Sequence, residues 1–200
     1  MKWLYKKDLR DTSSIQKVEQ TLGINFPLDY QKVILEHNGA TASPNTINTS
    51  RQIGKAFGEL LNFNLDSEEN ILSLYEELKN KIPEKVYPIT MDPEGNFLCY
   101  DFRDDQNNPK LVRWDHEQKF IIQDKKLIIE DYDKESDYYH VDFVANSFTE
   151  VLAELYGEDI EESNSWDKFQ DEEKLKQFSG EDLTQINRIR ALQGLPPIEK

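Results

Sequence analysis

The fold of this chain is decided by residues 86–100, which read VYPITMDPEGNFLCY. The two ends of this stretch, residues 86–91 and 96–100, are rich in the β-branched and aromatic residues that are typical of strands. Between them lies Asp-Pro-Glu-Gly at residues 92–95, with its proline and glycine where a tight turn needs them. The stretch therefore predicts two strands that flank a turn.

Further strands are expected along the chain after this pair. Residues 111–114 follow a polar loop and predict the next strand. The apolar runs at 120–122 and 127–129 surround a polar Gln-Asp-Lys-Lys turn, which predicts a second hairpin. Residues 138–141 could add an edge strand. This part of the chain therefore predicts a meander of strands.

Two helices are predicted before the strands. The first begins at Ser13, which is expected to form a capping box with Gln16, and it ends at Gly23. The second begins at Pro27, because proline is tolerated at the first helical position, and it ends at Asn38-Gly39. The stretch 40–51 is rich in Thr, Asn and Ser, which predicts an exposed loop.

A third helix is expected after Ser67, and a fourth after Ser147, which has Glu150 in the capping-box position. The order is therefore helices, then a meander, then a helix. This order predicts an α+β fold with a mostly antiparallel, curved sheet and helices packed against it.

The sequence predicts a main domain over residues 1–157 and a C-terminal part over residues 158–200, made of an acidic linker and a short helical appendage. The appendage carries large apolar residues that a solvated tail would not keep exposed, so we expect it to dock on the main domain. These residues are Trp166, Phe169, Phe178, Leu183, Ile186, Ile189 and Leu192.

The balance of acidic and basic residues indicates which class of partner the protein can bind. The 200 residues include 39 Asp and Glu against 24 Lys and Arg, which gives a formal net charge of −15. This excess disfavours DNA, RNA and anionic membranes, and it suits a basic protein. The single cysteine, Cys99, the charged residues 1–10 and the lack of a long apolar run predict a cytoplasmic protein without a membrane span.

No catalytic constellation emerges from the sequence. The three histidines lie far apart, and no nucleophile or phosphate-binding motif is present. The stretch 131–142 has a passing likeness to a calcium loop, but it lacks the glycine that makes the sharp turn at the sixth position. A solvated acidic loop is the preferred interpretation. We therefore expect no enzyme activity, no metal and no cofactor, and a metal-dependent enzyme that uses the acidic loops is kept as an alternative.

Several local strings, taken together and in order, resemble the SUKH superfamily, which is named partly after the yeast Smi/Knr cell-wall-assembly regulators. The resemblance covers about residues 12–157. The strings that carry it are Val18-Glu19, Leu22-Gly23, Phe26-Pro27, Asp29-Tyr30, Leu35, Asn38-Gly39, Tyr87-Pro88-Ile89, Gly95-Asn96, Cys99-Tyr100-Asp101, Arg103, Val112, Trp114-Asp115-His116-Glu117, Ala145, Ser147-Phe148 and Val151-Leu152.

The resemblance implies an α+β module that binds a protein and does not catalyse a reaction. Bacterial members of the group commonly resemble immunity proteins, which bind the toxin domain of a polymorphic or contact-dependent toxin. Many such toxins are nucleases with basic clefts, and an acidic binder fits them. The alternative is a regulatory or scaffold module without a toxin partner, like the yeast regulators.

Contacts to the partner are expected from acidic loops, because most of the shared motif residues have structural explanations. The candidates are Asp101, Asp104, Asp105, Asp115, Glu117, Glu130, Asp131, Asp133, Glu135 and Asp137. A further acidic cluster at Glu68, Glu69, Glu76 and Glu77 is typical of a solvated helix face. The sequence leaves open whether Trp114 belongs to the core or to the interface.

Overall fold

The structure is a computed structural model that describes residues 1–116, 120–123, 126–129, 141–160, 187, 190 and 196–198. The chain forms two compact units, Met1–Ile160 and Glu161–Lys200. The first unit is built on an antiparallel sheet of seven strands in the order β1-β2-β5-β6-β7-β8-β11. The helices and the large antiparallel sheet confirm the predicted α+β fold.

The strands of this sheet are β1 (Lys2–Leu4), β2 (Thr41–Ser43), β5 (Glu59–Leu60), β6 (Val86–Met91), β7 (Phe97–Asp101), β8 (Lys110–Trp114) and β11 (Val141–Ala145). Two further pairs stand apart from it, β3 (Thr46–Ile47) with β4 (Lys55–Ala56), and β9 (Phe120–Gln123) with β10 (Lys126–Ile129). The second pair confirms the predicted hairpin. Of the expected edge strand, residues 138–140 lie outside the described chain, and Val141 begins β11.

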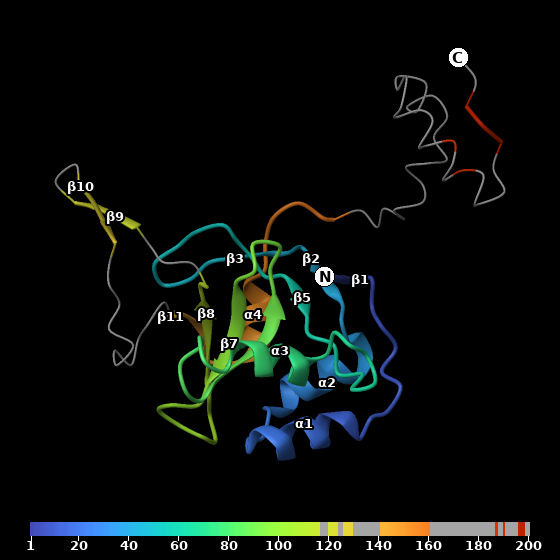
Figure 1. The fold of residues 1–200 in the computed structure, drawn as a ribbon, viewed down its shortest axis with the longest axis horizontal. Helices are drawn as coiled ribbons and strands as arrows, with labels where there is room; N and C mark the ends of the chain where they lie inside the picture. Colours follow the sequence, from blue (N-terminus) through green and yellow to red (C-terminus); the bar gives the residue numbers. More distant parts are fainter. Residues whose placement is uncertain are drawn as a thin grey trace. The chain divides into compact units, whose positions relative to one another are not determined.

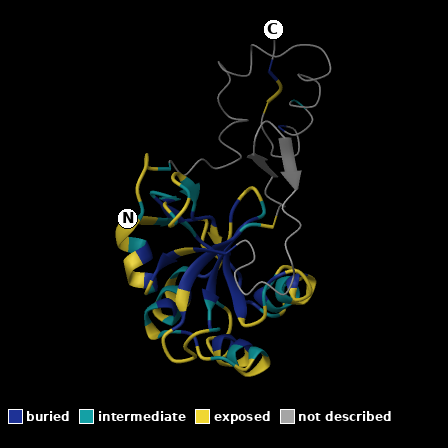
Figure 2. Ribbon diagram, turned by 90° about the vertical axis from the view of Figure 1, so that its left-hand side faces the viewer, coloured by how far each residue is buried: buried dark blue, intermediate teal, exposed yellow. Residues whose placement is uncertain are grey.

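The helices cover the two faces of the sheet unequally (Figure 1). They are α1 (Ser14–Leu22), α2 (Leu28–His37), α3 (Ile71–Leu78) and α4 (Phe148–Glu154). Helices α1, α2 and α4 bury their apolar residues in the larger core cluster. The smaller cluster, on the other side of β7 and β8, is closed by the end of α3 and the residues after it. Figure 2 shows that the central strands are buried, while the helices expose their outer edges.

The hairpin at residues 86–100 has the predicted form. Met91 pairs with Phe97, and the carboxylate of Asp92 accepts hydrogen bonds from the backbone N–H groups of Glu94 and Asn96 at 2.9 and 2.8 Å. Asp92 also forms a buried ion pair with Arg113 of β8 at 2.8 Å. The turn is therefore tied to the next strand by charge as well as by the ladder.

Trp114 belongs to the core. Its side chain is 2% exposed, and its ring stacks on Phe97 with 5.7 Å between ring centroids. Val112 lies in the same cluster as Trp114, because residues two apart on a strand point to the same face. The structure thus excludes Trp114 as an exposed anchor for a partner.

Two predicted helix caps are wrong. Ser13 has helical backbone angles and makes no cap bond, and instead its N–H and hydroxyl donate to the carboxylate of Asp11 at 2.9 and 2.8 Å. The third helix is capped by Asn70 and not by Ser67, because the Asn70 side chain reaches the backbone N–H groups of the first turn. The cap at Ser147 is confirmed, since its hydroxyl accepts from the N–H of Glu150.

The predicted exposed loop at residues 40–51 is also wrong. This segment supplies β2 and β3, and Ala40, Ala42 and Ser43 are fully buried. Its small and polar residues fit into a sheet because their polar groups are bonded internally. Ser43 illustrates this, since its hydroxyl accepts a hydrogen bond from the N–H of Ile160 at 2.8 Å.

The end of the same segment covers the outer edge of β11. The N–H of Ser50 donates to the carbonyl of Phe143, and Thr49 and Gln52 donate to the carboxylate of Asp142. Asp142 also pairs with Arg51 and is 2% exposed. The last position of the calcium-like stretch is therefore buried and bonded to protein, and residues 131–140 of that stretch lie outside the described chain. This arrangement blocks strand addition at the β11 edge.

His37 makes the stability of the first unit dependent on pH. Its ring stacks on Trp3 of β1 at 5.1 Å, and burial, together with nearby Lys6, lowers the pKa of His37 below its ordinary value of about 6.5 despite the opposing effect of Glu36. The unfolded chain therefore binds the proton more readily, so stability falls as the pH drops through about 6.5. We expect the His37→Phe variant to lose less stability than the parent between pH 8 and pH 5 in urea denaturation. Parallel losses in the two proteins would contradict this expectation.

In the second unit the described residues form one local cluster. The Asn187 side chain bonds both the N–H and the carbonyl of Ile198, at 2.7 and 3.2 Å, and Arg190 donates to the carbonyl of Pro196 at 2.8 Å. Residues 158–160, which the sequence predicts to begin the linker, belong to the first compact unit. Docking of the appendage on the main domain stays a prediction.

Candidate functional site

A groove of about 390 Å³ lies between α3 and the part of the sheet formed by β5 and the end of β6. Four apolar residues line it, Leu60 of β5, Leu61 directly after β5, Leu74 of α3 and Met91 of β6. Met91 is a large hydrophobic side chain that is 43% exposed. The groove therefore offers apolar surface to solvent, next to the glutamates that form its rim.

The charged lining of the groove is strongly acidic. Glutamates come from β5 and from both ends of the α3 region, and the only described cation among the lining residues is Lys7. The glutamates are Glu59, Glu68, Glu69 and Glu77. Lys7 pairs with Glu59 at 2.8 Å, whereas no ion pair with a described residue neutralises Glu68, Glu69 or Glu77, which are exposed. The groove carries net negative charge.

The walls of the groove are held by an asparagine cluster, which consists of Asn38, Asn62 and Asn64. Asn38 Nδ2 donates to Asn62 Oδ1 at 3.0 Å, and Asn62 Nδ2 donates to the carbonyl of Glu69 at 3.1 Å. All three asparagines are buried. Because these amides are shielded from water, their bonds fix the end of α2 and the segment before α3 in one arrangement.

The same cluster positions Lys7. The N–H of Lys7 donates to the carbonyl of Asn38 at 2.8 Å, and Asn38 Nδ2 donates to the carbonyl of Lys7 at 3.1 Å. The stem of Lys7 crosses Gly39 so closely that a Cβ at Gly39 would lie 2.8 Å from Lys7 Cδ. The Asn38-Gly39 pair therefore ends α2 and also positions Lys7, whose ammonium group reaches into the groove.

The structure brings together three of the predicted contact residues at one end of β7. Asp101 is mostly buried, with 13% of its side chain exposed, and its carboxylate is bonded by the Arg103 guanidinium at 2.9 and 2.7 Å. Asp104 is exposed and pairs with Lys110 at 3.2 Å. Asp105 is exposed, and the N–H of Asn107 lowers the pKa of its carboxyl. Of the three, Asp101 is the least available to a partner.

The other predicted contact residues are not gathered at this end. Asp115 follows β8 at the opposite end, because β7 and β8 are antiparallel and Asp101 pairs with Lys110. Its side chain is 17% exposed and lies 3.6 Å from the Arg113 guanidinium. Glu117, Glu130, Asp131, Asp133, Glu135 and Asp137 lie outside the described residues. The described candidates thus occupy two separate places and not one surface.

The sequence does not predict the groove. The acidic cluster at residues 68–77 predicts a solvated helix face, whereas the structure places three of its glutamates in the lining of the groove. A groove needs a second wall, and that wall comes from β5, which has two residues, and from Lys7, which lies far away in sequence. The unbroken apolar pair Leu60-Leu61 was the only signal in the sequence for this wall.

The described residues give little support to a metal site, a reactive thiol or a membrane-spanning helix. They contain no group of three or more His, Cys, Asp or Glu side chains that could hold a metal ion. Cys99 is fully buried, as predicted, and burial raises the pKa of its thiol. His116 lies beside Asn96, with 3.1 Å between His116 Nδ1 and Asn96 Oδ1. None of the described helices has the length and apolar character that a membrane crossing requires.

Comparison with known proteins identifies the family. A search among curated proteins finds no match. A comparison with protein families matches residues 12–152 to SUKH_6, which is described as SMI1-KNR4 cell-wall. The match covers well over half of the chain, and it includes α1 to α3, the first part of α4 and the strands that build the groove. The chain therefore belongs to the SUKH_6 family of the SMI1-KNR4 cell-wall type.

Proposed function

We propose that this protein is a cytoplasmic immunity protein, which binds and neutralises the toxin domain of a polymorphic or contact-dependent toxin. The observation that carries this proposal is the groove with three exposed glutamates that no described cation pairs. The family supports a protein-binding role, and the net charge of −15 favours a basic partner, such as a nuclease domain.

Neutralisation would follow from occupation of the toxin's basic cleft. Such a cleft has to attract phosphates, so it also attracts a protein surface rich in carboxylates. An acidic binder of this kind covers the cleft and excludes the nucleic acid without any chemistry of its own. Besides the groove, the exposed carboxylates of Asp104 and Asp105 and the acidic residues 117 and 130–137 stay candidates for these contacts.

The identity of the partner tests the proposal. The full-length protein is tagged and recovered from its native host, and proteins that copurify at one-to-one stoichiometry are identified. We expect a protein with a basic toxin domain, whose expression stops growth unless this protein is expressed with it. A stoichiometric partner without toxicity, such as a cell-wall enzyme or a regulator, would favour the scaffold alternative and overturn the immunity proposal.

The association rate with such a partner should depend on salt. Complementary charge speeds the encounter of two proteins, and salt screens it over about 10 Å at 0.1 M. We expect the association rate to fall at least about tenfold between 10 and 150 mM NaCl, while the dissociation rate changes less. Stopped-flow fluorescence measures both rates. An association rate that does not respond to salt would remove charge from the proposal and leave a mainly apolar interface.

A further inference from the structure

We propose that the groove between α3 and β5 receives a lysine or arginine side chain of the partner, and that Lys7 partly fills this site until that side chain displaces it. The proposal rests on the proposed function for the sign of the partner's charge. It goes further because it assigns the site, the chemistry of its occupant and an internal competitor.

The composition of the groove matches a long cationic side chain. Lysine and arginine have an apolar stem and a charged head, and they bury the stem only where the head finds polar or opposite charge. Leu74, which is partly exposed, and Met91, which is exposed, provide apolar contact in the groove, with glutamates around them. Its volume of about 390 Å³ has room for more than one such side chain. A purely apolar segment would leave the glutamates without a partner, and an acidic segment would be repelled by them.

The rim charges point the same way. Glu69 and Glu77 flank the α3 side of the groove, and neither forms an ion pair with a described residue. Like charges held close together raise each other's energy, and a cation placed among them relieves this repulsion. The asparagine cluster holds the backbone of Glu69 in place through Asn62 before any partner arrives. Binding would therefore require little ordering of this wall.

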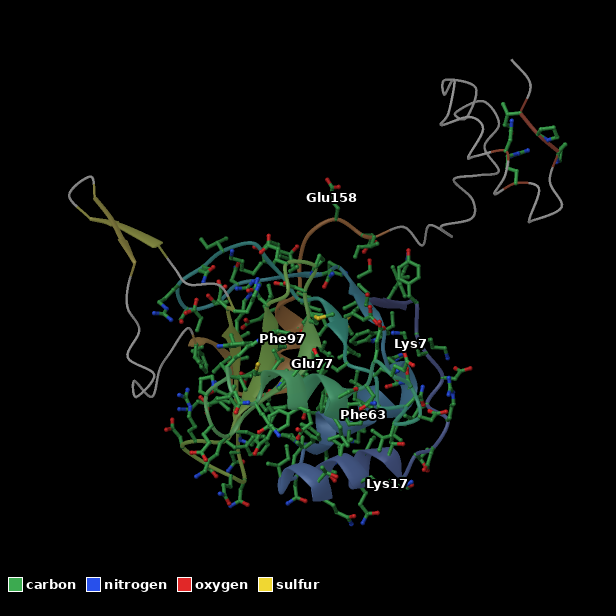
Figure 3. All side chains as sticks on the ribbon, in the orientation of Figure 1. Lys7, Lys17, Phe63, Glu77, Phe97 and Glu158 are labelled. Atoms are coloured by element: carbon green, nitrogen blue, oxygen red, sulfur yellow. The ribbon has the colours of Figure 1, made fainter. Side chains whose placement is uncertain are left out.

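Lys7 supplies a cation from within the chain. Its backbone is fixed by two hydrogen bonds to Asn38, and its ammonium lies 2.8 Å from Glu59. The side chains of Lys7 and Glu59 are still 45% and 48% exposed, so the pair is weak and can be exchanged. Figure 3 shows Lys7 on the N-terminal segment and Glu77 on α3. A partner cation would gain Glu59 and the other glutamates together, whereas Lys7 pairs with Glu59 alone among the described residues.

The test uses an acetylated and amidated hexalysine peptide as the probe, with isothermal titration calorimetry on the full chain at 20 mM NaCl. Lys7→Met should tighten binding about fivefold, because it removes the competitor. Its matched control is Lys17→Met, which removes the same charge from a similar exposed pair with Asp11 at 2.8 Å on α1. This control should change the affinity by less than twofold. In NMR spectra, the peptide should shift the side-chain signals of Lys7 and leave those of Lys17 unchanged.

The acidic wall has its own matched pair of variants. Glu77→Gln should weaken peptide binding about fivefold, and Glu154→Gln, an exposed glutamate on α4, should weaken it less than twofold. Equal effects within either pair of variants would overturn the proposal, because the peptide would then respond to total charge only. Unchanged Lys7 signals at saturation would also overturn it.

These outcomes separate the groove from the proposed function. If a toxin partner is found and Glu77→Gln binds it as tightly as the parent, the groove proposal fails while the immunity function stands. If the peptide binds as expected and the native partner is not a toxin, the groove proposal stands and the immunity function fails.

Discussion

Replacing Gly58 with alanine is expected to cost about 4 kcal/mol of folding free energy, which is a large part of the stability of a domain. Gly58 has a φ angle of +90°, and a Cβ there would lie 2.3 Å from the carbonyl oxygen of Met91 and 2.8 Å from the N of Asp92. Both obstacles are backbone atoms, so no side chain can rotate to relieve the clash. The β5 end and the β6 end would have to separate, which adds packing loss to backbone strain.

Gly54→Ala is the matched control for this variant. Gly54 has a similar φ angle of +73°, but a Cβ there would meet no atom within 4 Å. The control therefore carries the strain of a left-handed backbone without the clash, and we expect it to cost about 1 kcal/mol. Urea denaturation of both variants, followed by circular dichroism, measures the difference. Equal losses in the two variants would show that the close approach of Gly58 to β6 does not matter.

The position of Gly58 also bears on the groove. It precedes Glu59 and Leu60, which form β5 and one wall of the groove. Its N–H donates to the Asn45 side chain at 3.0 Å, so the turn before β5 is held from both sides. A shift of β5 would move Glu59 away from Lys7. The Gly58→Ala molecules that remain folded should therefore bind the hexalysine probe with an affinity different from that of the parent.

The elements that could be predicted from the sequence have local causes. The hairpin at residues 86–100 depends on two runs rich in β-branched and aromatic residues and on a turn whose proline and glycine are visible in the sequence. The helix that ends at Gly23 and the helix that Ser147 caps also carry their signals within a few residues. In each of these cases the physical cause acts over a few residues, so no knowledge of the tertiary structure is needed.

The elements that the sequence does not predict have distant causes. β2 is polar and short, and it is a strand because β1 and β5 flank it. β5 has only two residues and no periodicity to detect. No window of neighbouring residues contains this information.

The candidate site divides in the same way. Acidic side chains are easily found in a sequence, and exposure is the natural assumption for each of them. Asp101 departs from this assumption because Arg103, two residues away, folds back onto its carboxylate. The groove could not be predicted, since its charged lining joins residues 7, 59 and 68–77. Only the structure makes one site of them.

Substitution of Asn38 by alanine is the second variant with a large expected effect. Asn38 is 1% exposed, and its side chain makes three hydrogen bonds within the described chain. It donates to the carbonyl of Lys7 and to Asn62 Oδ1, and it accepts from the N–H of Phe63. Truncation would remove all three hydrogen bonds, two of which, those with Asn62 and Phe63, are buried. Each buried group that loses its bond costs about 1–3 kcal/mol, and partial relaxation brings the expected loss to about 3–4 kcal/mol.

Asn48→Ala is the matched control for Asn38→Ala. The Asn48 side chain also makes hydrogen bonds, to the N–H of Gly54 at 3.0 Å and to the hydroxyl of Tyr156 at 2.7 Å, but Asn48 is exposed. Water can replace these bonds, so we expect a loss below about 1 kcal/mol. Urea denaturation again measures both. A loss at Asn38 no larger than that at Asn48 would show that the asparagine cluster does not hold this part of the fold.

The two functions assigned to Asn38 can be separated by temperature. We expect Asn38→Ala to be folded well below its lowered melting point. At such a temperature, the missing Asn38 side chain affects only the hydrogen bond that positions the Lys7 backbone and the link to Asn62 and Glu69. If the hydrogen bond from Asn38 holds Lys7 in the groove, the side-chain NMR signals of Lys7 in this variant should approach those of a solvated lysine. The signals of Lys17, which lies on α1 and pairs with Asp11, should stay as they are in the parent. Because both lysines have similar exposure and equal pair distances in the parent, any difference between them traces to the asparagine cluster.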